Sequence, residues 1–420
     1  MSRPGLPTPP PQRFATGCRL LLALGLALLL AAPAASALND AQQVVVEAWR
    51  LVNQSYVDPS QLDAAGWRRL RQRALERPIE TSAQAHDGIE AMLRPLGDPY
   101  TRLLRPDDYR ALRATTEGRV SGVGLQLALR DTDQRIVVIS PLDGSPAAAA
   151  GIPSGTEVVR VDGQAAAELG LERTAAALRG DAGSEVLLDL RLPSGRTKEL
   201  VLTRRTVDLQ PVRCRRIRWD GHTFAYVRLT QFSEPVPRQL QQTLAELQND
   251  GPAPEGLILD LRNNSGGLVD AGLAVANDLL DGGPIVETID RNGVPIGQTA
   301  RAGQLYGGPM VTLVNGGTAS ASEILAGALQ DDGRSQLLGS RTFGKGLIQT
   351  LISLSDGSGL AVTVARYVTP SGRDIQNQGI EPDVRLPDPE PLNPGSPDDP
   401  WLEAALAALA DRAADGAPGA

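Results

Sequence analysis

Strands and helices alternate along the second half of this 420-residue chain, from Thr206 to about Asp383. Short apolar runs alternate there with stretches whose apolar residues recur at helical spacing. The predicted strands are Phe224–Leu229, Leu257–Leu261 and Met310–Val314, and the predicted helices are Arg238–Leu247, Val269–Leu280 and Ser322–Leu329. This order predicts an α/β core in which helices cover the faces of a sheet. Leu347–Leu354 and Leu360–Val368 add a predicted hairpin across Asp356-Gly357.

The sequence before and after this core divides into segments of different character. Residues 38–105 carry three apolar stripes of helical period, which predict a helical N-terminal region. Residues 106–205 carry five short strands and two short helices, Ser145–Ala150 and Leu171–Leu178, between turn signals, which predict a small β-rich module. Residues 386–420 hold a proline-rich linker and then a short helix, Trp401–Ala413. A chain of this length has room for two or three domains.

Residues 1–37 have the pattern of a secretory signal. Three arginines accompany an apolar run, Leu20–Leu30, that is too short to span a bilayer comfortably, and Ala35-Ser36-Ala37 is an A-x-A cleavage site. An uncleaved anchor is the alternative interpretation. Removing the segment deletes three arginines and no acid, which takes the formal charge from −8 to −11. This acidity argues against nucleic acid or an anionic membrane surface as a partner, and no stable membrane span is expected after cleavage.

Several kinds of catalytic centre are hard to build from this composition. The chain has two histidines, His86 and His222, and no G-x-S-x-G elbow, so a Ser-His-Asp triad would have to recruit one of the two. Cys214 is the only cysteine beyond the signal, which excludes a disulfide or a cysteine cluster within one chain. Gly339–Lys345 nearly spells a nucleotide-binding G-x-x-x-x-G-K loop. However, Gly346 stands where Ser or Thr is required, and a strand rather than a helix is predicted to follow.

Lys345 is one of only two lysines in a chain whose other basic residues are almost all arginines. A lysine can lose its proton inside a protein, whereas an arginine cannot. Neutralising a lysine at pH 7 costs roughly 4–5 kcal/mol. Burial without a carboxylate partner can lower the pKa of a lysine by an amount that corresponds to this energy. Lys345 lies between two glycines and close to apolar residues, so it is a candidate general base. The plainer interpretation is a chance survivor in an arginine-rich composition.

Ser320 follows a predicted strand and a glycine-rich turn, and it begins a predicted helix. With Glu323 it fits the capping box S-x-x-E, which by itself explains a serine here. The same position places the hydroxyl beside free backbone N–H groups at the positive end of a helix, and these groups favour an alkoxide and a tetrahedral oxyanion. Serine–lysine dyads are an accepted variant of the triad. Ser320 is therefore the candidate nucleophile, Lys345 its base, and Gln349 a partner that would orient the amine.

Two glycine-rich turns supply candidate binding groups. Gly266 and Gly267 follow a predicted buried strand, at the edge where α/β sheets place their sites, and permit a backbone N–H to point into a cleft as an oxyanion donor. A plain strand–helix loop is the alternative. In the β-rich module, a turn that enters a strand can present N–H groups to a terminal carboxylate while the strand pairs with the peptide. That turn consists of Gly122, Val123, Gly124 and Leu125.

Together these residues resemble the C-terminal processing peptidases, also called tail-specific proteases. The matching segments are Leu96–Thr101, Gly122–Leu125, Asn315–Arg334, Thr342–Gly346 with Gln349, and Tyr367–Asp383. The resemblance covers nearly all of residues 40–385, and the spacing from Ser320 to Lys345 is similar to that of the family dyad. The arrangement looks most like the photosynthetic branch, which processes the photosystem II reaction-centre D-one precursor in the thylakoid lumen.

The resemblance implies a nucleophile at Ser320, a general base at Lys345 with Gln349 beside it, and an oxyanion hole from the N–H groups of Gly266 and Ala321. It implies an α+β multidomain fold: a PDZ domain at 106–205, with Gly122–Leu125 as its carboxylate-binding loop, and a crotonase-like serine–lysine protease core at 206–385. Members of the family need no metal or cofactor.

The expected partners are C-terminal tails of proteins, the reaction-centre precursor above all, in the thylakoid lumen or the periplasm. Two alternatives stay open at this point. One is a general periplasmic tail-specific protease. The other is a PDZ scaffold on a catalytically idle core, in which Ser320 is only a helix cap. Cleavage of a peptide with an apolar C-terminus separates the scaffold from either protease.

Overall fold

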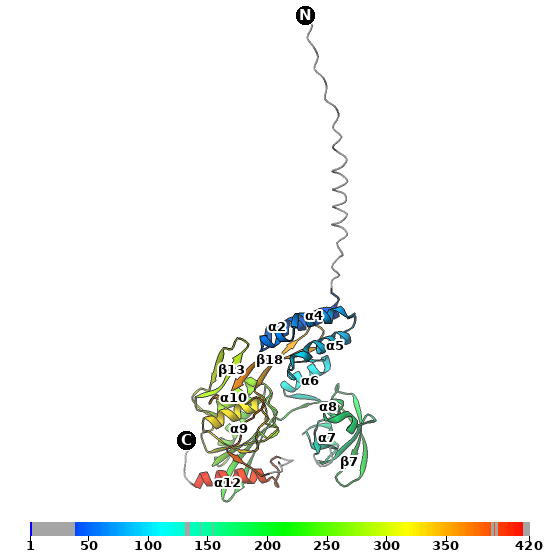
Figure 1. The fold of residues 1–420 in the computed structure, drawn as a ribbon. Coiled ribbons are helices and arrows are strands. Elements are labelled where there is room, and N and C mark those ends of the chain that lie inside the picture. The colour runs from blue at the N-terminus through cyan, green and yellow to red at the C-terminus, as the bar shows by residue number, and fades with distance from the viewer. Residues whose placement is uncertain are drawn as a thin grey trace.

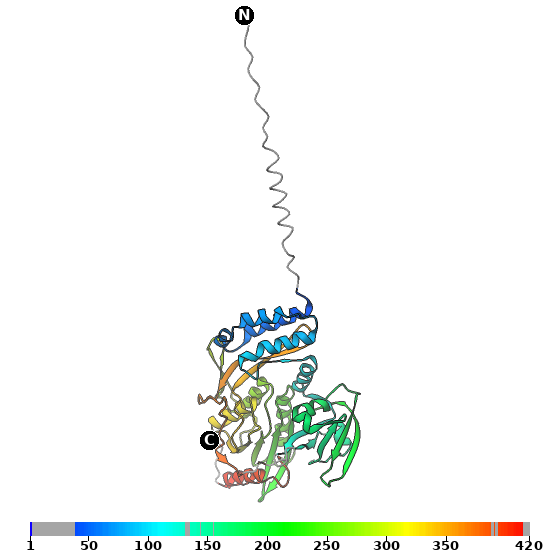
Figure 2. The same ribbon diagram turned by 45° about the vertical axis from the view of Figure 1, so that its right-hand side comes forward.

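The computed structural model describes Met1 and residues 38–130, 135–142, 144–153, 155–387, 390 and 394–414. Apart from Met1, the predicted signal at 1–37 lies outside the described residues. A helical N-terminal region, a β-rich module at one side and a larger α/β core follow one another along the chain (Figures 1 and 2). In the described ranges no helix has both the length and the apolar character that crossing a membrane requires.

The N-terminal region is helical, as predicted. Its elements are α2 (Asp40–Ser55), α3 (Pro59–Ala64), α4 (Trp67–Glu76), α5 (Ser82–Leu93), η1 (Arg94–Leu96) and β1 (Arg102–Leu104). The helix α6 (Pro106–Thr116), which the sequence placed in the β-rich module, also packs here, because Tyr109 contacts Leu104 and Ala361. Asn39 and Thr81 start α2 and α5 with capping boxes, which satisfy N–H groups at both helix starts. The apolar stripes of these helices pack on Leu354, Leu360 and Val362. The region thus shares its core with strands from the far end of the chain.

The β-rich module is built on a sheet of order β3-β4-β5-β7-β8, with β6 paired to β5. Its elements are β2 (Arg119–Gly122), β3 (Leu125–Arg130), β4 (Arg135–Pro141), α7 (Pro146–Ala149), β5 (Glu157–Val161), β6 (Gln164–Ala165), α8 (Ala166–Leu178), β7 (Glu185–Arg191), β8 (Thr197–Thr203) and β9 (Arg205–Asp208). The antiparallel pair β2–β9 carries the chain into and out of the module. The sequence predicted a helix only from Leu171, because Gly170, with φ 74°, interrupts the helical pattern of α8.

The core contains a six-stranded sheet of order β10-β11-β12-β15-β16-β19. Its strands are β10 (Val212–Trp219), β11 (His222–Leu229), β12 (Gly256–Asp260), β15 (Met310–Val314), β16 (Gln336–Gly339) and β19 (Val384–Arg385), and all neighbours except β10 and β11 run parallel. Alternate side chains of β11, β12 and β15 enter two separate apolar clusters, one on each face. Helices α9 (Val236–Asn249), α10 (Val269–Leu279) and α11 (Ala321–Asp331) cover one face, and α12 (Pro400–Ala414) covers the other.

A second sheet links the core to the N-terminal region. Its order is β1-β18-β13-β14, with β17 paired to β18, and its further strands are β13 (Pro284–Asp290), β14 (Pro295–Thr299), β17 (Leu347–Ser353) and β18 (Gly359–Val368). The antiparallel pairing of β17 with β18 confirms the predicted hairpin. The long strand β18 also pairs with β1, so the helical region is joined to the core by backbone hydrogen bonds as well as by side chains.

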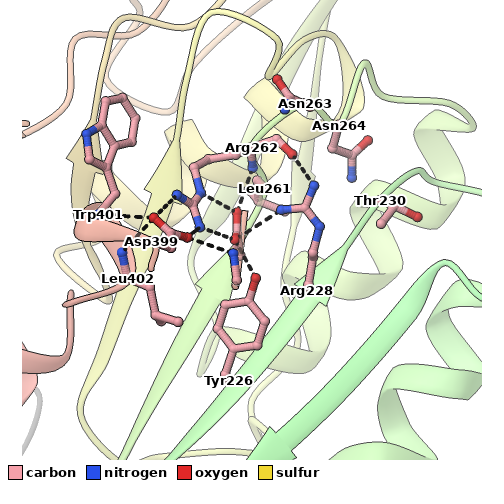
Figure 3. A network of polar contacts seen from close by, with 12 residues as sticks. Tyr226, Arg228, Thr230, Leu261, Arg262, Asn263, Asn264, Asp399, Trp401 and Leu402 are labelled. Carbon is pink, nitrogen blue, oxygen red and sulfur yellow. Dashed lines mark hydrogen bonds and ion pairs between the residues drawn. The ribbon is translucent and has the colours of Figure 1, made fainter. Parts of the chain in front are cut away.

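A buried ionic cluster fastens α12 to the end of strand β12 (Figure 3). Arg262 donates to both oxygens of Asp399 at 2.6 and 3.0 Å and to both oxygens of Asp260 at the same two distances. Burial alone would raise the pKa of Asp260, but the charges of Arg262 and Arg228 bring it below its ordinary value. Asp399 also accepts the N–H groups of Trp401 and Leu402, so it caps α12 as well.

We expect Asp399→Asn to lower the free energy of unfolding by about 3 kcal/mol, because it leaves a net positive charge in a dry cluster while asparagine still caps the helix. Urea unfolding followed by circular dichroism measures the change. Asp411→Asn removes an exposed charge from the same helix and should change stability by less than about 0.5 kcal/mol. Equal stabilities for the two variants would show that the cluster does not hold α12.

Candidate active site

Ser320 lies at the junction of β15 and α11, where the sequence placed it. It is the N-cap of α11 and adopts φ 57° and ψ −119°, a conformation that residues other than glycine rarely take. Backbone strain of this kind persists only where the surrounding structure enforces it, and it is concentrated at functional sites. The side chain is buried, with 7% of its residue surface exposed. A strained, buried serine at a helix start has the surroundings that a nucleophile requires.

Glu323 ties the serine to the lysine loop. One oxygen of its carboxylate accepts the N–H groups of Ser320 and Lys345, both at 2.9 Å. The other accepts the hydroxyl of Thr342 at 2.6 Å and the N–H of Gly344 at 2.8 Å. The sequence predicted a capping role for this residue but not its reach to the loop. The signal was present, since Glu323 is the single acid at the start of an otherwise apolar helix.

Tyr367 makes a second link between the same two residues. Its hydroxyl lies 3.0 Å from the carbonyl oxygen of Ser320 and 2.7 Å from that of Lys345, and it donates its proton to this pair of acceptors. Burial, followed by the charge of Glu323, raises the pKa of Tyr367 well above its ordinary value, so the hydroxyl keeps its proton. Sequence reasoning gave this tyrosine no role, because its contacts join β18 to distant segments.

The amine of Lys345 is half-buried, and burial lowers its pKa. Arg102 lowers it further, while Asp98 and Glu323 act in the opposite direction. The net direction is the one that a general base requires. Both Ser320 and Lys345 belong to the described part of the chain, and no hydrogen bond joins their side chains there. The Nζ atom instead lies 5.1 Å from the ring centroid of Tyr100.

Gln349 lies on β17 beyond the lysine, but its amide donates to Thr363 at 3.5 Å rather than to the amine. Thr363 in turn donates to Asp98 at 2.7 Å, and Thr101 donates to the same carboxylate oxygen. The structure therefore places Gln349 in a polar chain that leads to Asp98, whose charge acts on Lys345. Direct support of the amine by Gln349 stays a prediction.

The two expected oxyanion donors flank the serine. A Cβ atom on Gly266 would lie 2.9 Å from the Cβ of Ser320 and 2.7 Å from the carbonyl oxygen of Ala319, so only glycine permits this approach. The N–H of Gly266 donates to the side chain of Asn264 at 3.0 Å. Ala321 is the first residue of α11, where a helix N–H has no carbonyl one turn before it. The N–H of Ala321 is thus available to an oxyanion, whereas the N–H of Gly266 has a partner that the substrate would have to replace.

The predicted carboxylate-binding loop joins β2 to β3 beside the end of α8. A Cβ atom on Gly124 would lie 2.2 Å from that of Ser145, and one on Gly122 would lie 2.8 Å from the carbonyl oxygen of Leu178. The loop therefore packs too closely for larger residues. The N–H of Val123 donates to Leu178 at 3.2 Å, so this group belongs to the fold of the module. Carboxylate binding by the loop stays a prediction.

Comparisons with known proteins agree with this architecture. Residues 223–386 match the model of peptidase family S41, and residues 113–191 match the PDZ domain. A carboxyl-terminal-processing protease of Picosynechococcus is 44% identical over 395 residues, which cover 93% of this chain and 94% of that protein. The chloroplastic C-terminal processing peptidase of Tetradesmus obliquus is 43% identical, with 86% of this chain and 80% of that protein covered.

A solved structure agrees as well. A photosystem II D1 C-terminal processing protease is 41% identical and has a TM-score of 0.63, with 90% of this chain and 99% of that chain covered. The expected fold and enzyme class are confirmed, and the idle scaffold loses its support. The chain belongs to peptidase family S41 and is a carboxyl-terminal-processing serine protease that carries a PDZ domain.

Proposed function

We propose that the protein binds the free C-terminus of a protein in its PDZ domain and cuts the same chain with Ser320 and Lys345. The observation that carries the proposal is the Glu323 carboxylate, which receives backbone N–H groups from both residues and so fixes nucleophile and base relative to each other. A small hollow lies between the two domains. Leu142 of the PDZ domain lines one side, and Leu209, Thr230 and Gln231 of the core line the other. We expect a bound tail to pass along this side of the molecule on its way from the PDZ domain to the core.

The reaction begins when the Lys345 side chain turns from Tyr100 towards Ser320. The neutral amine takes the hydroxyl proton, and the oxygen attacks a peptide carbonyl upstream of the bound end. The N–H groups of Gly266 and Ala321 stabilise the oxyanion, which requires the Asn264 side chain to release Gly266. Protonated Lys345 then gives its proton to the leaving amine, and water hydrolyses the acyl-enzyme.

The rate should rise with pH as Lys345 loses its proton, because only the neutral amine accepts one. Its lowered pKa places this rise below the range of a free lysine. Arg102 contributes to the lowering, so Arg102→Gln should move the ascending limb of kcat/KM to higher pH. Arg110→Gln, which alters an exposed arginine on α6, serves as the control and should leave the profile in place. If the ascending part of the pH profile does not move in Arg102→Gln, the charge of Arg102 does not influence the pKa of Lys345.

We further propose the D1 precursor of photosystem II as the substrate, in the thylakoid lumen or periplasm. Two observations support this substrate. The similar solved structure is named a photosystem II D1 C-terminal processing protease, and similar proteases come from a cyanobacterium and a chloroplast. Incubation with the precursor from a processing-deficient strain should give one product that lacks its C-terminal extension, read by mass. A relative from Bartonella at 35% identity supports the alternative of a general tail-specific protease. An unchanged precursor mass, together with cleavage of unrelated apolar tails, would favour that alternative.

A further inference from the structure

The helix α4 carries a dense group of arginines on an acidic protein. Residues 67–77 hold five arginines and one acid, so this short segment has a net charge of +4 in a chain of formal charge −8. The five are Arg68, Arg69, Arg71, Arg73 and Arg77. None of them forms an ion pair within the described ranges, and all except the half-buried Arg71 are exposed. Charges that no acid of the fold neutralises are available to an external partner.

The arginines stand on a rigid support. Trp67 is buried at the start of α4, and its indole N–H donates to the carbonyl of Trp49 at 3.2 Å. The indole of Trp49 returns a bond to the carbonyl of Trp67 at 3.0 Å, and Arg71 lies over the Trp49 ring at 4.4 Å. These two reciprocal hydrogen bonds fix the rotation of α4 relative to α2. The exposed arginines of α4 therefore stay on its solvent-facing side.

A hollow of about 610 Å³ opens beside this face, between α2 and α4. Leu38, Val46 and Leu75 give it apolar lining, and its charged lining consists of Arg68, Arg69 and Arg71 with one acid, Glu76. An apolar floor with a cationic rim fits a molecule that has an apolar body and an anionic head, because arginine binds phosphate in a fork and tolerates apolar surroundings. Lipids of an anionic membrane have this chemistry.

The position of the hollow in the chain also favours a membrane. Leu38 is the first residue of its lining, and only seven residues separate it from the apolar run that ends at Leu30. While the expected signal stays attached, this short connection holds α4 near the bilayer. The acidic remainder of the protein is repelled by an anionic surface, so docking through α4 would have one orientation.

We propose that the arginine face of α4 docks the protein on an anionic membrane surface, with lipid headgroups on Arg68, Arg69 and Arg73 and the hollow beside them taking part of a lipid. This departs from the expectation drawn from net charge, because charges within a Debye length of the surface count for more than the total charge of the chain.

Vesicle sedimentation tests the proposal. The full chain is mixed at low salt with vesicles of phosphatidylcholine alone or with about 30% phosphatidylglycerol, and the bound fraction is measured. A juxtamembrane arginine strengthens binding to an anionic leaflet by roughly fivefold, so reversing Arg68, Arg69 and Arg73 to Glu should weaken it by at least about 100-fold. The control reverses Arg218, Arg301 and Arg385, which are exposed on the core, and changes the net charge equally. It should stay within about fivefold of wild type.

Binding through an apolar N-terminal segment cannot give this result. The wild type, the α4 variant and the control all carry that segment, and its binding does not depend on the charge of the lipid headgroup. Cleavage of a soluble peptide should be equal in the three proteins, which shows that each is folded and separates this test from the proposed proteolysis. Three outcomes would overturn the proposal: no preference of the wild type for anionic vesicles, an equal loss in the control, or α4-dependent binding to poly-glutamate without binding to vesicles. The last would assign the face to an acidic protein.

Discussion

Ser320→Ala and Lys345→Ala should each lower kcat/KM by at least about 1,000-fold, with a peptide that ends in a free apolar residue as substrate. The first removes the attacking oxygen, and the second removes the group that takes its proton. Residues that act as one unit are not additive, so the double variant should be no slower than about the worse single variant. Initial rates followed by mass spectrometry measure all three.

Two lysine variants sharpen this test. Lys345→Arg keeps the positive charge but cannot lose its proton, so it should be as inactive as Lys345→Ala. Lys198→Ala alters the only other lysine, which is exposed on β8 of the PDZ domain, and should retain wild-type rates. An active Lys345→Arg would mean that the residue acts through its charge and not as a base.

Glu323→Gln should lower kcat by at least about 100-fold and the free energy of unfolding by roughly 2–4 kcal/mol. Four donors converge on the carboxylate, from Ser320, Thr342, Gly344 and Lys345. A glutamine keeps one acceptor oxygen and turns an NH₂ group towards donors, so at least one backbone N–H loses its partner. The serine and the lysine loop then no longer share one anchor.

The kinetic pattern separates positioning from general damage. The PDZ domain is distant in sequence and has its own apolar cluster, so KM for a long peptide should change little while kcat falls. Glu403→Gln alters an exposed acid on α12 and should leave both constants unchanged. A Glu323→Gln protein with full kcat and reduced stability would make Glu323 a structural cap only.

The strands and helices of the core were predictable because the arrangement of apolar residues within each segment indicates a strand or a helix. β12 and β15 are buried at every position, and α11 begins at a local capping pattern. The hairpin of β13 and β14 was missed, since β14 is exposed at every position and has no apolar alternation. The joining of the N-terminal helices to β18 was also missed, because a shared core between distant segments leaves no local signal.

The same distinction holds at the active site. Ser320 and its relation to Glu323 follow from four consecutive residues, and Lys345 follows from the scarcity of lysine. Tyr367 and Tyr100 reach the site from other segments, so only the fold reveals them. The partner of Gly266, the side chain of Asn264, depends on the conformation of one loop and could not be read from spacing.

The most direct test of the central claim is to identify the acylated residue. The protein is mixed with an ester analogue of a cleavable peptide, quenched in acid within the first turnovers, digested and analysed by mass. We predict an acyl adduct on Ser320 in the wild type, and none in Ser320→Ala or Lys345→Ala. An adduct on another residue, such as the free thiol of Cys214, or no adduct during active turnover would contradict the serine–lysine mechanism.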